Sequence, residues 1–176
     1  MNFYKSLAIV FLVISFGLTE SLYDAYQNAG PANGFDKYLV LNPDSIYTGG
    51  IGTFEESMYI DGNGAVIDLK DGAGIWAYGE GDAVGTITIK HCSVINGSDT
   101  GINFTGIAQG EIVNCNFHNN SRGIQAGDFT EVTVTNCNVS GSDYGIAMID
   151  SNAVYHISYC NTWDNRIGDY MKDCFG

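Results

Sequence analysis

The chain has 176 residues, of which 45% are hydrophobic and only 15% are charged, and its net charge at pH 7 is −13. This length and apolar content suit one folded domain with a buried core, which argues against wholesale disorder. The negative charge argues against binding to nucleic-acid phosphates or anionic membrane surfaces, since like charges repel. Glycine is abundant (23 residues) and proline is rare (2 residues), a composition typical of short strands joined by glycine and asparagine turns.

Residues 1–20 have the pattern of a secretory signal peptide. Lys5 supplies a positive charge, and Leu7 to Leu18 form a 12-residue apolar stretch, shorter than the roughly 20 residues that a membrane span needs. We expect cleavage between Gly17 and Ser21, a secreted or extracytoplasmic location, and no membrane insertion after cleavage. The alternative is an uncleaved N-terminal anchor.

Residues 21–37 are expected to form a capping helix and a turn. Leu22, Ala25 and Tyr26 lie at helical spacing, and Gly30-Pro31 is a stop signal. Residues 38–176 are expected to form one β domain. In this part apolar residues alternate with polar ones, and Asn-Pro and Gly-Asn-Gly mark turns.

A repeat of about 22 residues becomes measurable after Gly85. Its markers are Cys92, Cys115, Cys137 and Cys160, which are 23, 22 and 23 residues apart, and Gly101, Gly123, Gly145 and Gly168, which are 22, 22 and 23 apart. Two independent markers with one period predict a solenoid. A unit this short has room for three short strands. Parallel pairing would place equivalent residues of successive coils about 4.8 Å apart, one above the other.

The segments "IDGNGAVID", "CSVINGSDTGINF", "CNFHNNSRGIQA" and "CNVSGSDYGIAM" resemble the right-handed parallel β-helix of the pectin lyase-like superfamily. The resemblance covers roughly residues 38–173 and implies an all-β, single-stranded right-handed parallel β-helix. We expect about five to six coils, with the helix covering the first. The repeat puts Asp169 where an inward isoleucine is expected, so the last unit is either a degenerate closing coil or a junction to further domains of a longer parent chain. The superfamily includes lyases, glycoside hydrolases and non-catalytic proteins, so fold alone assigns no activity.

Two columns are expected to be structural. A line of cysteines, one per coil, cannot surround a zinc ion, so Cys92, Cys115, Cys137 and Cys160 are interpreted as small buried hydrophobic residues. The residues one position later, Ser93, Asn116, Asn138 and Asn161, are expected to form a ladder of side-chain hydrogen bonds. Cys174 lies outside the column and is either free or paired with Cys160.

Asp128 and Asp150 are candidate calcium ligands. Each stands five residues after its repeat glycine, so coils in register would stack their carboxylates. Stacked like charges are unfavourable unless a cation bridges them. The alternative is a pair of solvated turn aspartates that splay apart, and no other cofactor is expected.

Arg122 and Asp143 are the catalytic candidates. Lyases that the chain resembles abstract a proton with a basic residue beside calcium-binding carboxylates, and an arginine among acids approximates that arrangement. Ordinary surface ion pairs explain the same residues. The sequence lacks the paired-aspartate and Arg-Ile-Lys signatures of polygalacturonase-like enzymes and the proline-flanked arginine motif of pectate lyases. These absences argue against an inherited catalytic apparatus.

Outward aromatic and amide side chains are the candidates for ligand binding: Trp76, Trp163, Tyr144, Asn103 and Gln125. Exposed rings beside amides suit stacking on sugar rings and hydrogen bonds to hydroxyl groups. Packing of the same rings against a loop or the helix is the alternative. We therefore expect a secreted, non-catalytic β-helix module that binds extracellular polysaccharide. The alternative function is a carbohydrate-active enzyme, either a polysaccharide lyase or a glycoside hydrolase.

Overall fold

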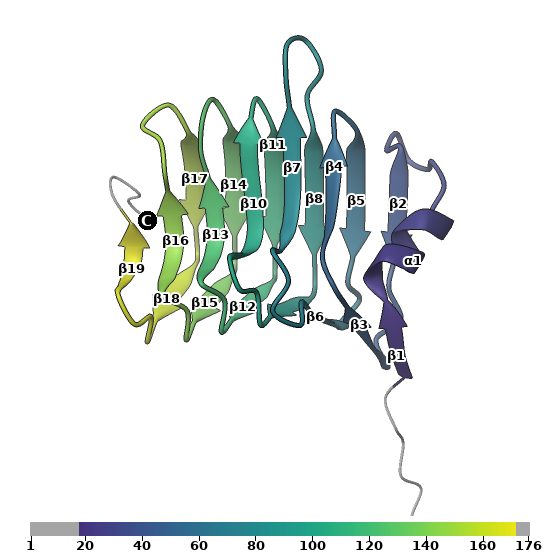
Figure 1. The fold of residues 1–176 in the computed structure, drawn as a ribbon, viewed down its shortest axis with the longest axis horizontal. Helices are drawn as coiled ribbons and strands as arrows, with labels where there is room; N and C mark the ends of the chain where they lie inside the picture. The colour runs from purple at the N-terminus through teal and green to yellow at the C-terminus, as the bar shows by residue number, and fades with distance from the viewer. Residues whose placement is uncertain (1–17, 172–176) are drawn as a thin grey trace, which may run out of the picture.

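Three parallel sheets wind around one core in a computed structural model, which describes residues 18–171 (Figure 1). The first sheet consists of β1 (Leu18–Ser21), β3 (Ser45–Thr48), β6 (Val66–Asp68), β9 (Ser93–Ile95), β12 (Asn116–His118), β15 (Asn138–Ser140) and β18 (Asn161–Trp163). The second consists of β4 (Ile51–Phe54), β7 (Ile75–Gly79), β10 (Thr100–Gly106), β13 (Arg122–Ala126), β16 (Tyr144–Met148) and β19 (Gly168–Met171). The third consists of β2 (Lys37–Val40), β5 (Ser57–Asp61), β8 (Thr86–Lys90), β11 (Gln109–Val113), β14 (Glu131–Thr135) and β17 (Val154–Ser158).

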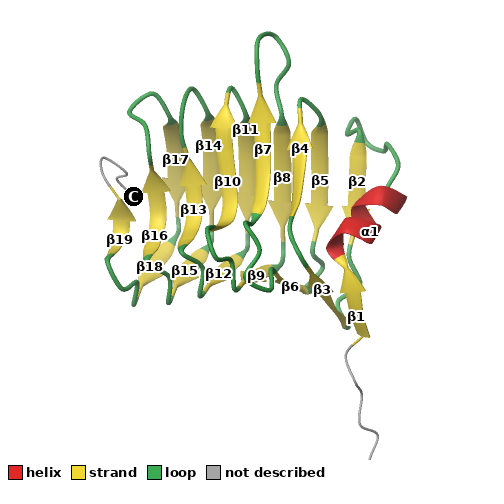
Figure 2. Cartoon of the chain, viewed as in Figure 1, coloured by secondary structure: helices red, strands yellow, loops and turns green. Residues whose placement is uncertain are grey.

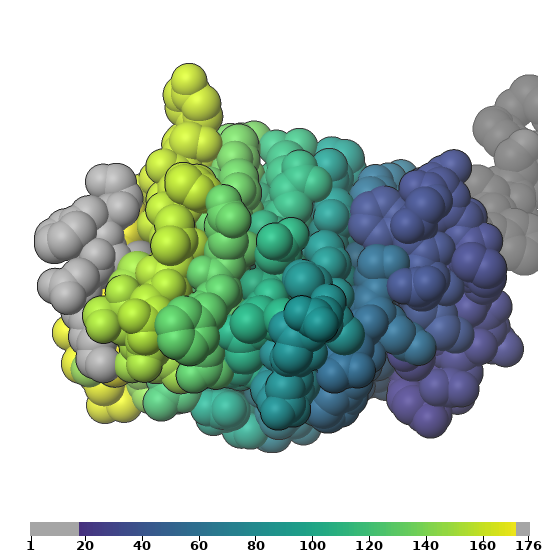
Figure 3. All heavy atoms as spheres, turned by 90° about the horizontal axis from the view of Figure 1, so that it is seen from above, coloured from purple at the N-terminus to yellow at the C-terminus, as the bar shows by residue number. Residues whose placement is uncertain are grey.

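The chain advances by one coil each time it visits the three sheets in turn. The space-filling view shows the result as successive bands of colour along the long axis (Figure 3). The second and third sheets form the front and back of the solenoid in Figure 1, so their outer faces look in opposite directions. No helix in residues 18–171 is long and apolar enough to cross a membrane.

The solenoid makes about seven turns, so the expected five to six was too low. The shortfall arises because the first coils lack the cysteine and vary in length, so the glycines in register with Gly101, which are Gly74 and Gly50, fall outside the 22-residue period. Ile46 pairs with Val66 after 20 residues, and Val66 pairs with Ser93 after 27, whereas Ser93 and Asn116 are 23 apart. The longest of these coils carries the β7–β8 connection, which projects beyond its neighbours (Figure 1).

Helix α1 (Leu22–Asn28) covers the first coil, as the sequence predicted (Figure 2). Ser21 is its N-cap, and the Ser21 hydroxyl accepts a hydrogen bond from the amide of Asp24 at 3.1 Å. The side chain of Leu22 is fully buried against the core. Most of the expected leader lies outside the described residues, but Leu18–Ser21 form strand β1, which pairs with β3.

Inward-facing residues stack in continuous columns. Ile75, Ile102, Ile124 and Ile146 pair in register on successive strands of the second sheet, and all four are fully buried. The repeat glycines stand where this column approaches the first sheet. A Cβ atom on Gly123 would lie 2.2 Å from the side chain of Val139 and 2.7 Å from the carbonyl oxygen of Gly145. The glycine marker therefore reflects a position with no room for a side chain.

The register shifts by one residue in the last coil. Gly168 pairs with Tyr144 rather than with Gly145, so Tyr170 pairs with the inward Ile146. The expectation that Asp169 takes the inward position is therefore wrong. The connection between β18 and β19 contains one residue more than that between β15 and β16. The Asp169 carboxylate instead accepts a hydrogen bond from the Asn165 amide at 2.8 Å.

Candidate ligand-binding site

A shallow cavity of about 250 Å³ lies on the outer face of the second sheet. We call it the Trp76 cavity, and its lining residues are Ala73, Trp76, Asp99, Thr100 and Asn103. Trp76 belongs to β7, and Asn103 is its direct partner on β10. The cavity therefore combines an aromatic wall from one coil with polar groups from the next.

The indole of Trp76 lies against the backbone of the preceding coil. Gly52 pairs with Trp76, and a Cβ atom on Gly52 would lie within 2.6 to 2.9 Å of three atoms of the indole. Any side chain at position 52 would therefore displace the ring. The edge of the indole meets Phe54 in a T-shaped contact, with ring centroids 4.8 Å apart and planes at 81°. Gly52 and Phe54 together hold the indole in one orientation.

An amide ladder continues from the cavity along the solenoid axis. Asn103 pairs with Gln125 on β13, and the Gln125 Nε2 group donates a hydrogen bond to Asn103 Oδ1 at 3.0 Å. Gln125 is only 5% exposed, and its Oε1 atom is buried without a hydrogen-bond partner among the described residues. The predicted column of Trp76, Asn103 and Gln125 is confirmed as a register. Its role in ligand binding stays a prediction.

The two catalytic candidates bind different partners. The guanidinium of Arg122 donates a hydrogen bond to Asp99 Oδ1 at 2.7 Å, while Asp143 accepts one from Arg166 at 2.8 Å. The hydrogen bond from Arg166 holds the pKa of Asp143 below its usual range. Arg122 and Asp143 thus form parts of two separate ion pairs on neighbouring coils.

This arrangement offers little for acid–base chemistry. The Arg122 guanidinium donates to the Asp99 carboxylate, and a guanidinium offers only donor groups. Glycoside hydrolysis in most families needs two carboxyl groups flanking the bond, and Asp99 is the one carboxylate among the residues that line the Trp76 cavity. The described residues that line the Trp76 cavity therefore do not include such a pair of carboxyl groups.

The remaining ligand-binding candidates lie apart from the cavity. Trp163 belongs to the first sheet, where it pairs with Ser140 and is 53% exposed. Tyr144 pairs with Arg122 on the second sheet but does not line the Trp76 cavity. The predicted set of five residues is therefore spread over two faces, and only Trp76 and Asn103 meet in one cavity.

The calcium candidates bind backbone amides. Asp128 Oδ2 accepts a hydrogen bond from the amide of Gly106 at 2.8 Å, and Asp150 Oδ1 accepts one from Asn152 at 2.8 Å. Within residues 18–171 no three His, Cys, Asp or Glu side chains gather closely enough to suggest a metal site. Calcium binding at this pair stays a prediction, and Asp173 and Cys174 lie outside the described residues.

The cysteine column is reduced, and three of its four members are buried while Cys160 is half-buried. Cys92, Cys115, Cys137 and Cys160 are free thiols, and the sulfur atoms of Cys92 and Cys115 are 3.8 Å apart. A hydrogen bond with Cys115, together with burial, raises the pKa of Cys137 to about 12. Thiols react as thiolates, so the raised pKa of Cys137 opposes its reaction at neutral pH. The predicted structural role fits their position.

The asparagine column forms the predicted ladder over part of its length. Asn138 donates to Asn116 at 3.0 Å and Asn116 donates to Ser93 at 3.4 Å, while Asn161 follows in register on β18. A second ladder precedes the cysteines, where Asn136 donates to Asn114 at 2.6 Å. Sequence reasoning missed this second ladder, although the repeated Asn-Cys-Asn motif carries its signal.

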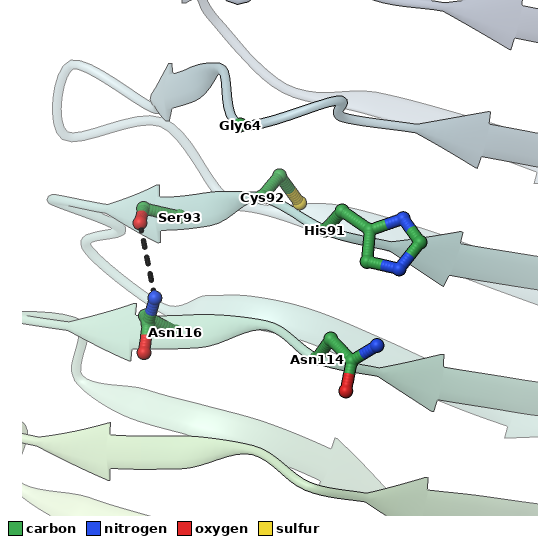
Figure 4. Close-up of a pocket in the computed structure, with 6 residues that line it drawn as sticks. All are labelled: Gly64, His91, Cys92, Ser93, Asn114 and Asn116. Atoms are coloured by element: carbon green, nitrogen blue, oxygen red, sulfur yellow. Dashed lines mark hydrogen bonds between the residues drawn. The ribbon is translucent and has the colours of Figure 1, made fainter.

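A second cavity of about 250 Å³ lies between these two ladders (Figure 4). Its lining residues are Gly64, His91, Cys92, Ser93, Asn114 and Asn116. His91 and Ser93 do not form a nucleophile and base pair. The imidazole contacts Asp61 at 3.1 Å and points away from Ser93, whose hydroxyl accepts the hydrogen bond from Asn116. The residues that line this second cavity are mostly polar, and none of them is a tryptophan, tyrosine or phenylalanine.

A family model described as "Right handed beta helix region" matches residues 45–173, well over half of the chain. The chain belongs to this right-handed β-helix family. The pectin lyase-like superfamily, which the repeat units resemble, is consistent with that family. Comparison with curated proteins gave no match, and comparison with solved structures gave none either.

Proposed function

We propose that this right-handed β-helix is a non-catalytic extracellular module that binds a polysaccharide at the Trp76 cavity. One observation carries the proposal: an indole held by Gly52 and Phe54 forms one wall of a polar cavity. Sugar rings have apolar faces that pack on aromatic rings, and their hydroxyl groups hydrogen-bond to amides and carboxylates. Trp76 supplies the first kind of contact, and Asn103 and Asp99 supply the second.

The shape of the surface supports a polymeric ligand. The cavity is shallow, and the outer face continues past it through Asn103 to β13. Successive coils are about 4.8 Å apart, so an extended chain along the solenoid axis would meet one row of side chains after another. A small ligand would use only the first of these rows.

The extracellular location rests on residues 1–20. Their charged start and short apolar stretch have the pattern of an exported leader. The net charge of −13 favours solubility after export.

The test is binding of purified protein to a panel of soluble polysaccharides, measured by isothermal titration calorimetry and tryptophan fluorescence. Trp76→Ala should weaken binding by about 30-fold or more, the effect of truncating an aromatic hot spot. Trp163→Ala is the matched control, because Trp163 is an exposed tryptophan on another sheet. The affinity of the Trp163→Ala variant for the polysaccharide should stay within about twofold of that of the wild type. Equal losses in both variants, or no loss in Trp76→Ala, would reject the site.

The enzyme alternative is tested with the same protein. A lyase releases unsaturated sugars, so absorbance should rise when polyuronates are incubated with protein, with and without calcium. We expect no rise, because Arg122 and Asp143 belong to separate ion pairs. A rise that disappears in Arg122→Gln would establish a polysaccharide lyase instead.

A further inference from the structure

We infer that the Trp76 cavity selects a neutral polysaccharide and rejects polyuronates, an inference that rests on the proposed function. Asp99 is the one charged side chain among the described residues that line the cavity. Arg122 binds Asp99 from the following coil and does not itself line the cavity. The charged group that lines the cavity is therefore a carboxylate, and the Arg122 guanidinium holds it in place.

The hydrogen-bonding groups of the cavity are complementary to hydroxyl groups. Gln125 occupies Asn103 Oδ1, so the Nδ2 group of Asn103 remains as a donor with no described partner. Arg122 occupies Asp99 Oδ1, which leaves Oδ2 as an acceptor. A sugar hydroxyl both donates and accepts, so it can satisfy either group. A uronate carboxylate is an acceptor only, so it can accept from Asn103 but cannot donate to Asp99, and the contact with Asp99 therefore distinguishes the two kinds of polymer.

Electrostatic repulsion also favours neutral polysaccharides over polyuronates. A polyuronate carries a negative charge on each sugar, and the protein carries a net charge of −13. Placing a second carboxylate beside Asp99 brings like charges together, which is unfavourable at short range even near a surface. A neutral chain meets no such opposition. Its binding should also depend little on salt, because screening acts only on charged partners.

The experiment compares neutral galactomannan and mixed-linkage β-glucan with polygalacturonate and alginate, using the full chain. The wild type should bind at least one neutral polymer about tenfold or more tighter than either polyuronate, since tenfold corresponds to about 1.4 kcal/mol. Neutral binding should change less than about twofold when salt rises from about 50 to about 500 mM.

Asp99→Asn should shrink the preference for neutral polymers, because it removes the repelling charge while keeping the shape. Asp143→Asn is the matched control, since Asp143 also binds an arginine on the same face but does not line the cavity. It should leave the preference unchanged. Thermal melting of both variants separates altered selectivity from misfolding.

The outcomes separate the two proposals. If a polyuronate binds as tightly as the neutral polymers and Trp76→Ala abolishes that binding, the site stands and the inference on ligand class falls. A preference that Asp99→Asn leaves intact also overturns the inference. If none of the four polymers binds, or if Trp76→Ala binds as the wild type does, the proposed function itself falls.

Discussion

Gln125 places a buried polar atom on the outer face of the solenoid, beside the proposed binding site. Its Oε1 has no hydrogen-bond partner among the described residues, while its Nε2 orients Asn103. Burying an unpaired carbonyl oxygen costs about 1–3 kcal/mol. Its register neighbour on β16 is Ala147, which has no side-chain donor to offer. The residue therefore contributes less to stability than its burial suggests.

We predict that Gln125→Met leaves the free energy of unfolding unchanged or raises it by up to about 1 kcal/mol. Methionine has a similar size, and the half-buried Asn103 Oδ1 can bond to water after the exchange. Urea unfolding measures the change, and Gln109→Met is the control because Gln109 is exposed. Binding of the neutral polymer should weaken severalfold, since Asn103 loses its fixed orientation. A loss of stability above about 2 kcal/mol would show that Gln125 is structural.

Side-chain partners were harder to predict than side-chain positions. The column of Trp76, Asn103 and Gln125 follows from the repeat alone, because equal sequence spacing places residues in register. The repeat does not decide whether Asp99 or Asp143 is the partner of Arg122. The two acids lie on the coils before and after Arg122, 23 and 21 residues away. Only the direction of the guanidinium, which points to the earlier coil, decides between them.

At the scale of elements, the repeat markers limited what the sequence could show. Cysteine and glycine recur at a regular spacing only from Cys92 onward, and the predicted coils there are confirmed. The earlier coils have inward residues of many kinds, among them Leu39, Tyr47 and Met58. Parallel pairing needs only an apolar residue that fills the inward position, so these coils form without the cysteine and without a constant length. The close approach of Trp76 to Gly52 lies in these coils of irregular length, and the sequence did not predict it for the same reason.

Strand β1 leads to a prediction about processing. Leu18–Ser21 pair with β3, Ser45 donates a hydrogen bond to the Glu20 carboxylate, and Thr48 donates to the Glu20 carbonyl oxygen at 3.2 Å. Cleavage within the expected window, between Gly17 and Ser21, decides whether these contacts survive. A mature chain that begins at Leu18 keeps them, whereas one that begins at Ser21 keeps only the helix cap.

We therefore predict that the exported protein begins at or before Leu18, which mass spectrometry of the intact mature protein would show. A recombinant chain that begins at Ser21 should unfold with about 1–3 kcal/mol less free energy than one that begins at Leu18, because several strand hydrogen bonds are lost. Both chains retain Ser21 as N-cap, which serves as the internal control. Equal stability would mean that β1 adds nothing to the fold.

At the scale of the whole molecule, the two ends of the solenoid differ. The first coil is covered by α1, whose Leu22 is fully buried. In the last coil, Tyr155 and Ile157 on β17 are only half-buried, while their register neighbours Val132 and Val134 on β14 are fully buried. Coils of a solenoid contact only their neighbours, so stability is close to a sum over adjacent interfaces. The last coil shares an interface with only one described coil.

We predict a gradient of hydrogen exchange along the solenoid. Backbone amides of β17, β18 and β19 should exchange faster than those of β11, β12 and β13, because local opening begins where burial is least. Mass spectrometry of deuterium uptake on the native protein resolves the two groups. Leu22→Ala should speed exchange in β2 and β4, which contact the cap, and leave β17 to β19 unchanged, since coils contact only their neighbours. Uniform exchange from β2 to β19, or a response of the far end to Leu22→Ala, would mean that the solenoid opens as one cooperative unit rather than coil by coil.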